Sequence, residues 1–405
     1  MRMTLLAVAL VCAGLLAADW PQLRGPKRDG HSAEADLIDT FGPKGPPVAW
    51  RREVGEGYAA PAVAGDRLAL FHRVGDSDAV ECLDASSGKP RWKFTYPTRY
   101  DDPLGKGNGP RATPVIAGGR VFTLGAGGQL HALDLKDGKK LWGKTLLDDY
   151  TVKPSYFGVG TTPLVEGKLL LVNVGGEGAG VVALDVETGK ERWRAGDDDA
   201  SYSSPVAATV GGARRVVFFT RTGLVMLDPE TGKVLASKRW RARIDASVNA
   251  AMPVLLGDDH LLLTASYGTG AVVLRLTRDG VEEVWKNATS LSSHFGTPVA
   301  VGEQLYGFEG RQEGGASLRC LDWKTGRVRW TEPGYGCGDL IAAGKKLFVM
   351  SEGGELVLLV ASAARHDEKA RARVLAAPFR SHLALANGLL YARDGRELVA
   401  WGVKR

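Results

Sequence analysis

Histidine and aspartate are the residue types in this chain that could support acid–base catalysis or metal binding, but their spacing fits no known motif. No two of the seven histidines form a His-x-His pair or a His-Glu-x-x-His motif. They are His31, His72, His131, His260, His294, His366 and His382. The run Asp197–Asp199 lacks the spaced ligands of a calcium loop, so we interpret it as a solvated loop. We therefore assign no catalytic residue and no metal ligand.

Nucleophile and nucleotide-binding motifs are also missing. The chain contains no Gly-x-Ser-x-Gly, Gly-x-Gly-x-x-Gly or Walker A sequence. Its four cysteines are Cys12, Cys82, Cys320 and Cys337, with no Cys-x-x-Cys and no adjacent pair. Cys12 lies within an apolar N-terminal run, and the three others cannot all pair with one another. We expect these three to be small core or loop residues.

A recurring phrase of the form Leu-Asp-x-x-x-Gly-Lys-x-x-Trp dominates the sequence and indicates a repeat architecture, at a period of about 45 residues. The clearest copies are Cys82–Trp92, Ala132–Trp142, Ala183–Trp193 and Cys320–Trp330. A weaker copy ends at Ala236 instead of a tryptophan, and a degenerate one ends at Trp285. Each phrase follows a Pro-containing apolar strand, so each unit is predicted to contain four short strands.

Each residue of the phrase has a physical role. The aspartates can accept hydrogen bonds from backbone N–H groups of the turn, and the glycines supply the positive φ that such turns need. The tryptophans offer a large flat surface that can cover the neighbouring unit. The predicted docking residues are Trp92, Trp142, Trp193, Trp285, Trp330, Gly88, Gly138, Gly189 and Gly326.

Four-stranded units at this period predict an all-β fold, an eight-bladed β-propeller of four-stranded antiparallel blades. The eighth unit has only three strands, within residues 383–401. We predict that Val48–Val54 supplies its missing outer strand and closes the ring, which removes an open sheet edge. The propeller then occupies residues 48–405.

The N-terminal residues predict export. Residues 1–18 have a short positive start and an uncharged apolar run of signal-peptide type. Residues 19–47 are predicted to be an irregular leader. No second apolar run is long enough to span a membrane. The net charge of +6 comes from dispersed Lys and Arg residues, so we expect no nucleic-acid partner, and we expect an exported, periplasmic or extracellular monomer.

Propeller geometry predicts where a ligand would bind. The connectors from one blade to the next converge on the central channel, and several carry aromatic or hydrogen-bonding residues. The candidate ligand-binding residues are Tyr58, Arg111, Tyr156, Tyr202, Asn249, His294 and His382. Arg111 and His294 carry directional donors, and a small anion or peptide carboxylate is the ligand that such a ring would suit. The alternative is that these residues satisfy turn backbone and pack between blades.

The repeated phrase resembles the tryptophan-docking motif of pyrroloquinoline quinone (PQQ) repeats. Asp19–Gly30, Gly109–Pro114 and Ala200–Pro205 are similar to segments of exported PQQ-binding-like β-propeller repeat proteins, a group that also resembles BamB, the outer-membrane assembly lipoprotein. The resemblance covers about residues 19–405. It implies a binding or scaffold propeller whose partner is another envelope protein or a small ligand, without a cofactor. Under the alternative, a quinone-dependent oxidoreductase, it implies PQQ with calcium, although this chain lacks the adjacent Cys-Cys of such enzymes.

Overall fold

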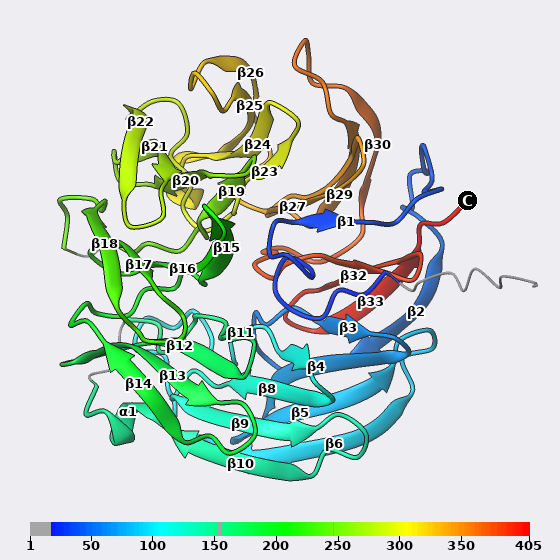
Figure 1. Ribbon diagram of the computed structural model, residues 1–405. Coiled ribbons are helices and arrows are strands. Elements are labelled where there is room, and N and C mark those ends of the chain that lie inside the picture. Colours follow the sequence, from blue (N-terminus) through cyan, green and yellow to red (C-terminus); the bar gives the residue numbers. More distant parts are fainter. Residues whose placement is uncertain (1–17, 153–155, 246) are drawn as a thin grey trace, which may run out of the picture.

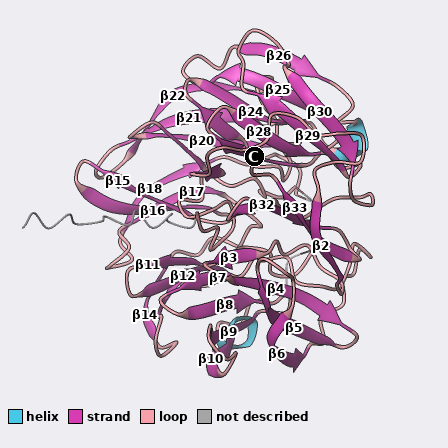
Figure 2. Ribbon diagram, turned by 90° about the vertical axis from the view of Figure 1, so that its right-hand side faces the viewer, coloured by secondary structure: helices cyan, strands magenta, loops and turns pink. Residues whose placement is uncertain are grey.

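The computed structural model describes residues 18–152, 156–245 and 247–405. They form eight sheets arranged as blades around a central axis (Figure 1), which confirms the predicted eight-bladed β-propeller. Nearly all regular structure is strand (Figure 2); the short helix α1 (Leu146–Asp149) and the 3-10 turn η1 (Gln312–Gly314) lie in loops. The proposed signal peptide lies outside the described residues, except for its last residue. Within the described residues, no helix is long and apolar enough to cross a membrane.

Seven blades each use four consecutive strands, from the inner strand at the axis to the outer strand at the rim. Blades 1 to 4 are β3 (Ala62–Ala64), β4 (Arg67–Val74), β5 (Ser77–Asp84), β6 (Pro90–Pro97); β7 (Val115–Ala117), β8 (Arg120–Leu124), β9 (Gln129–Asp134), β10 (Lys140–Thr145); β11 (Leu164–Glu166), β12 (Leu169–Gly176), β13 (Ala179–Asp185), β14 (Glu191–Ala195); and β15 (Val206–Val210), β16 (Ala213–Phe219), β17 (Gly223–Leu227), β18 (Val234–Arg239). Blades 5 to 7 are β19 (Val254–Leu256), β20 (His260–Ala265), β21 (Gly270–Leu276), β22 (Val281–Asn287); β23 (Val299–Val301), β24 (Gln304–Glu309), β25 (Ser317–Asp322), β26 (Val328–Glu332); and β27 (Asp339–Ala343), β28 (Lys346–Met350), β29 (Glu355–Val360), β30 (Glu368–Arg373).

Blade 8 joins the two ends of the propeller, as predicted. Its order is β31 (Ala384–Ala386), β32 (Leu389–Arg393), β33 (Glu397–Gly402) and then the N-terminal β2 (Val48–Glu53) as the outer strand. β2 runs antiparallel to β33, with Glu53 opposite Glu397. An ion pair between Arg52 and Glu81 of blade 1 holds the same junction. The ring is therefore closed by non-local pairing between its first and last strands.

At six junctions between described blades, a tryptophan of the outer strand donates a hydrogen bond to the next blade. The indole Nε1 of Trp142 donates to the carbonyl oxygen of Val186 (3.1 Å), in the turn between β13 and β14 of the next blade. The ring covers Gly189 of that turn, where a Cβ atom would lie 2.7 Å from Cε3 of Trp142. The same donation and the same cover over a turn glycine occur from Trp50 to blade 1, Trp92 to blade 2, Trp193 to blade 4 and Trp285 to blade 6. Glycine is needed at these positions for the close approach of the indole as well as for the positive φ.

The junction between blades 4 and 5 uses a different group. The outer strand β18 has Ala236 in place of the tryptophan. Arg215 on β16 is buried, and its Nε donates to the carbonyl oxygen of Arg278 (2.8 Å), in the turn between β21 and β22. A guanidinium thus makes the inter-blade hydrogen bond that an indole makes elsewhere.

The leader, residues 19–47, is ordered and lies across the middle of the ring (Figure 1). Most of it is irregular, as predicted, but β1 (His31–Ser32) pairs in parallel with the inner strand β27 and gives blade 7 a fifth strand. Trp20 exchanges backbone hydrogen bonds with Val63 of blade 1, and Pro21 accepts one from the N–H of Ile116 in blade 2.

Two arginines anchor the leader to the remaining blades. Arg28 donates to the carbonyl oxygens of Thr162, Pro163 and Pro205, beside the inner strands of blades 3 and 4. Arg24 donates to those of Pro298 (2.8 Å) and Leu340 (3.3 Å), in blades 6 and 7.

The leader completes its contacts with apolar and backbone groups. Leu23 belongs to the core cluster of blades 4 and 5, and the N–H of Ile38 donates to the carbonyl oxygen of Val403 after blade 8. The leader therefore reaches every blade, and it fills the channel on the face that carries the Asp-x-x-x-Gly turns, which we call the bottom face.

Candidate functional site

The opposite face of the propeller, here the top face, carries a pocket on the axis. Its volume is about 450 Å³. Residues from every blade-to-blade connector except that between β26 and β27 contribute to it, together with two turns that join second and third strands. The lining residues are Tyr58, Leu104, Lys106, Arg111, Tyr156, Phe157, Gly160, Tyr202, Val248, Ala250, Tyr267, His294, Phe295, Arg311, Gln312, Glu313, Arg380 and His382. We call this the axial pocket.

The structure brings six of the seven predicted candidates together in this pocket: Tyr58, Arg111, Tyr156, Tyr202, His294 and His382. Asn249 does not line it. Its side chain is buried and donates from Nδ2 to the carbonyl oxygen of Thr220 (2.9 Å), while its own carbonyl oxygen accepts from the N–H groups of Tyr202 and Ser203. Asn249 therefore holds the connectors around it in place.

Arg111 is largely committed to its own connector. Its Nη2 donates to Asp102 (3.1 Å) and to the carbonyl oxygen of Gly107, and its Nη1 donates to that of Gly109. The guanidinium lies 5.6 to 6.0 Å from the ring centroids of Tyr58, Tyr100 and Phe157. The donors that we expected Arg111 to offer to an anion are thus taken up by groups of its own connector. Asp102 belongs to no sequence motif and is brought to Arg111 by the fold of the connector.

Two other arginines, Arg311 and Arg380, line the axial pocket and form fewer hydrogen bonds within the protein than Arg111 does. Arg311 stacks over the ring of Tyr267, with its Cζ 3.9 Å from the centroid, and pairs with the exposed Glu313 (3.2 Å). Among the described residues, Arg380 has one ion-pair partner, Glu352, at 3.8 Å. The Nε atoms of both are buried without a hydrogen-bond partner. Sequence reasoning missed Arg311 and Tyr267, since they lie in turns between second and third strands, which reach the same face as the connectors.

His294 is held on both ring nitrogens. Its Nδ1 donates to Oε1 of Gln312 (2.8 Å), and the hydroxyl of Tyr267 lies 3.2 Å from its Nε2. Burial lowers the pKa of His294 from its ordinary value, and Arg311 acts in the same direction. The neutral imidazole is therefore part of the pocket wall.

His382 is held by a buried carboxylate. Its Nδ1 donates to Oδ1 of Asp339 (3.0 Å), and Oδ2 of Asp339 accepts from the N–H of Leu383 (2.8 Å). The same carboxylate lies 3.5 Å from Nη1 of Arg24 in the leader. Asp339 and Arg24 are each 1% exposed. The leader on the bottom face and the axial pocket thus share one carboxylate.

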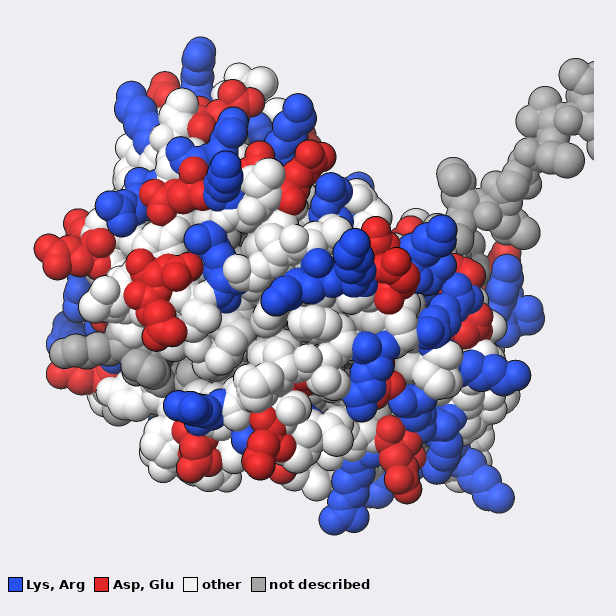
Figure 3. Space-filling model, turned by 90° about the horizontal axis from the view of Figure 1, so that it is seen from below, with Lys and Arg blue, Asp and Glu red and all other residues white. Residues whose placement is uncertain are grey.

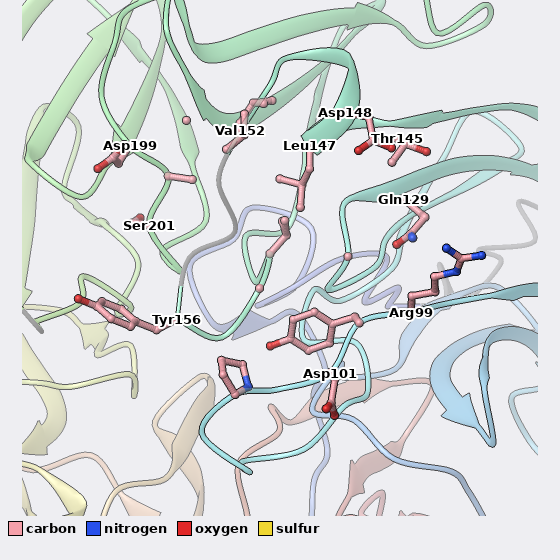
Figure 4. A pocket seen from close by; sticks show the side chains of 18 of the residues that line it. Arg99, Asp101, Gln129, Thr145, Leu147, Asp148, Val152, Tyr156, Asp199 and Ser201 are labelled. Atoms are coloured by element: carbon pink, nitrogen blue, oxygen red, sulfur yellow. The ribbon is translucent and has the colours of Figure 1, made fainter.

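A second hollow, here the side cleft, lies beside the axial pocket between the top loops of blades 1 to 4. Its volume is about 1070 Å³. Arg99, Asp101, Gln129, Asp148 and Asp199 surround it (Figure 4), and Tyr156 stands between it and the axial pocket. Its charged side chains come from separate loops and form no compact group of one sign.

The described residues contain no cluster of potential metal ligands, and their cysteine thiols are buried. Among those residues, no group of three or more His, Cys, Asp or Glu could hold a metal ion. Cys82, Cys320 and Cys337 are buried and unpaired. Burial raises the pKa of Cys320 to about 11 and that of Cys337 to about 12, so these thiols are poor nucleophiles.

The outer surface carries charges of both signs. Figure 3 shows basic and acidic side chains interspersed over the side of the molecule that lies lowest in Figure 1. Many pair across strands or turns, as Arg91 does with Asp66 and Asp84.

Comparison with known proteins gives a consistent family. The sequence profile described as "Outer membrane protein assembly factor BamB" matches residues 38–142 and 78–332. A curated protein of that name from Burkholderia pseudomallei (strain K96243) is 25% identical over 242 residues, 57% of this chain and 57% of the relative. The quinohemoprotein alcohol dehydrogenase ADH-IIG of Pseudomonas putida is 28% identical over 201 residues, 48% of this chain and 24% of the enzyme.

The fold is shared with solved structures. The structure of quinohemoprotein alcohol dehydrogenase ADHIIG from Pseudomonas putida HK5 matches with a TM-score of 0.55 and 12% identity, covering 96% of this chain and 80% of that one. At this level of identity, the structural match shows a common β-propeller fold. The chain spans little more than half of the BamB relative's length and about a quarter of the curated enzyme's length.

Proposed function

Because the chain belongs to the family described as outer membrane protein assembly factor BamB, we propose that it is an exported binding propeller of the bacterial cell envelope. It acts by holding an acidic group of a partner protein in the axial pocket. The family description supports an envelope protein as the partner.

The observation that carries this proposal is the pair Arg311 and Arg380. Both guanidinium groups line the axial pocket, and their ion-pair partners are Glu313 at 3.2 Å and Glu352 at 3.8 Å, which leaves other N–H groups of each guanidinium to donate to a ligand. A carboxylate is the ligand that would satisfy such donors, because a charge-assisted hydrogen bond to guanidinium is stronger than a neutral one. The rings of Tyr58, Tyr156 and Tyr267 supply apolar walls beside them.

Binding of an acidic peptide tests the proposal. The probe is a fluorescein-labelled hexaglutamate, followed by fluorescence anisotropy, with hexaglutamine as the uncharged peptide control. The double variant Arg311→Ala, Arg380→Ala should weaken binding by about tenfold or more, since a hydrogen bond to a charged group contributes about 1.5–3 kcal/mol.

The control variant is Arg192→Ala on the outer strand β14, because the side chain of Arg192 is 61% exposed and does not line the axial pocket. It should bind the peptide as the unchanged protein does. Equal binding by the double variant and the unchanged protein would place recognition outside the axial pocket and overturn the proposal.

The quinone-dependent alternative needs PQQ and calcium, and the residues present do not fit that pair. Calcium takes six to eight oxygen ligands, whereas Glu313 is the only carboxylate among the described residues that line the axial pocket, and it pairs with Arg311. An absorbance titration with PQQ, with and without calcium, distinguishes the two functions. Calcium-dependent binding together with oxidation of an alcohol would favour the enzyme.

A further inference from the structure

The leader and the axial pocket meet at one buried carboxylate. Asp339 begins the inner strand β27 of blade 7 and is 1% exposed. Its Oδ1 lies 3.5 Å from Nη1 of Arg24 in the leader and 3.0 Å from Nδ1 of His382. A buried carboxylate needs such compensation, since an isolated charge in the interior is costly.

Arg24 is placed for this contact by the leader itself. Its backbone has φ of +62°, and its guanidinium packs against Gly30, where a Cβ atom would lie 2.4 Å from Nη2. Its other acceptors are neutral carbonyl oxygens, so Asp339 is its one ion-pair partner among the described residues. Burial lowers the pKa of Arg24, and Asp339 opposes that effect.

The hydrogen bond fixes what His382 offers to the pocket. With Nδ1–H bound to a carboxylate, the neutral imidazole carries its hydrogen on Nδ1, and Nε2 is an acceptor. His382 lines the axial pocket. The other charged or titratable groups around the pocket are Lys106, Arg111, His294, Arg311, Glu313 and Arg380.

We propose that Arg24 is a positioning residue for the axial pocket: it neutralises the charge of Asp339 and so fixes the hydrogen bonding and orientation of His382. This inference rests on the proposed function and narrows its ligand. The pocket would take a carboxylate next to a hydrogen-bond donor, with the carboxylate on Arg311 or Arg380 and the donor on Nε2 of His382. Loss of Arg24 leaves the charge of Asp339 less compensated, which repels an anionic ligand.

Arg28 offers a matched control in the same segment. It is also a buried leader arginine, at 3% exposure, with a positive φ and hydrogen bonds to carbonyl oxygens beside the inner strands, but no contact between it and Asp339 is found. Arg24→Met and Arg28→Met therefore each remove one positive charge from the leader. Only Arg24→Met removes the charge that lies beside Asp339.

Hydrogen exchange of the Leu383 amide, followed by mass spectrometry on peptides that cover 380–385, tests the link without any ligand. Arg24→Met should raise that exchange rate, Arg28→Met should leave it unchanged, and Arg24→Lys should restore most of the protection. Equal exchange in Arg24→Met and Arg28→Met would refute the link between leader and pocket.

Hexaglutamate binding gives the second readout. Arg24→Met should weaken it by about fivefold, within the range of typical coupling between two sites, and Arg28→Met should not. If the unchanged protein fails to bind the peptide, the proposed function fails, while the exchange experiment still decides on the link. If the peptide binds and Arg24→Met binds it equally well, the electrostatic role of Arg24 is wrong.

Discussion

Replacing Trp142 by alanine is expected to loosen the junction between blades 2 and 3. The indole is half-buried, so truncation should cost about half of the 3–5 kcal/mol typical of a fully buried tryptophan. The carbonyl oxygen of Val186 also loses its donor, which adds about 1 kcal/mol. The free energy of unfolding should therefore fall by about 3 kcal/mol.

Thermal unfolding measures this loss. With an unfolding entropy of about 2.1 cal/mol/K per residue, a chain of 405 residues loses about 3–4 °C in Tm for 3 kcal/mol. The control is Leu141→Ala in the same strand, because Leu141 is 42% exposed and exposed substitutions change stability by no more than about 0.5 kcal/mol.

Hydrogen exchange should localise the effect of Trp142→Ala to the turn at Gly189, whose N–H donates to Asp185. If Trp142→Ala and Leu141→Ala unfold at the same temperature, the indole does not hold the blades together.

Three further predictions concern other parts of the ring. Deleting 48–54 removes the outer strand of blade 8 and should lower Tm sharply; an unchanged melting curve would mean that β2 is not needed for closure. Arg215→Ala should destabilise about as much as loss of a docking tryptophan, because the carbonyl oxygen of Arg278 loses its donor; a change in Tm no larger than that of a surface variant would contradict this role. Burial raises the pKa of Asp78 to about 6 from 3.8. The folded state therefore holds this proton more tightly than the unfolded state, and the free energy of unfolding falls as the pH rises from about 4 to about 6. At pH 7, Asp78→Asn should be up to about 3 kcal/mol more stable than the unchanged protein, with the difference vanishing near pH 4; a difference in Tm that is independent of pH would refute this assignment.

The repeat and its closure could be predicted because they depend on short-range patterns. Each Asp-x-x-x-Gly turn and its tryptophan lie within one segment of eleven residues. The last unit has only three strands in the sequence, which indicates that one more strand must come from elsewhere in the chain. The docking exception at Ala236 was visible as a missing tryptophan, but its replacement by Arg215 was not, since an arginine on a second strand carries no signal for a hydrogen bond to the next blade.

The site was predictable in position and only partly in composition. Convergence of the connectors follows from the fold and located six pocket residues. The commitment of Arg111 depends on the conformation of a loop that contains Asp102. The role of Arg24 depends on Asp339, more than 300 residues later in the chain, so no local pattern could indicate it.

The leader has a consequence for the order in which the molecule can fold. It precedes every blade in the chain, yet its contacts lie in all of them, and β2 pairs with β33, about 350 residues later. The leader and β2 therefore have no complete binding surface until the last blade has folded. Blades 1 to 7 can stack on one another before then through neighbouring contacts. Insertion of the leader and closure of blade 8 are thus expected to be the late, slow step, and a partly folded chain would expose both the empty channel and two unpaired sheet edges to other proteins.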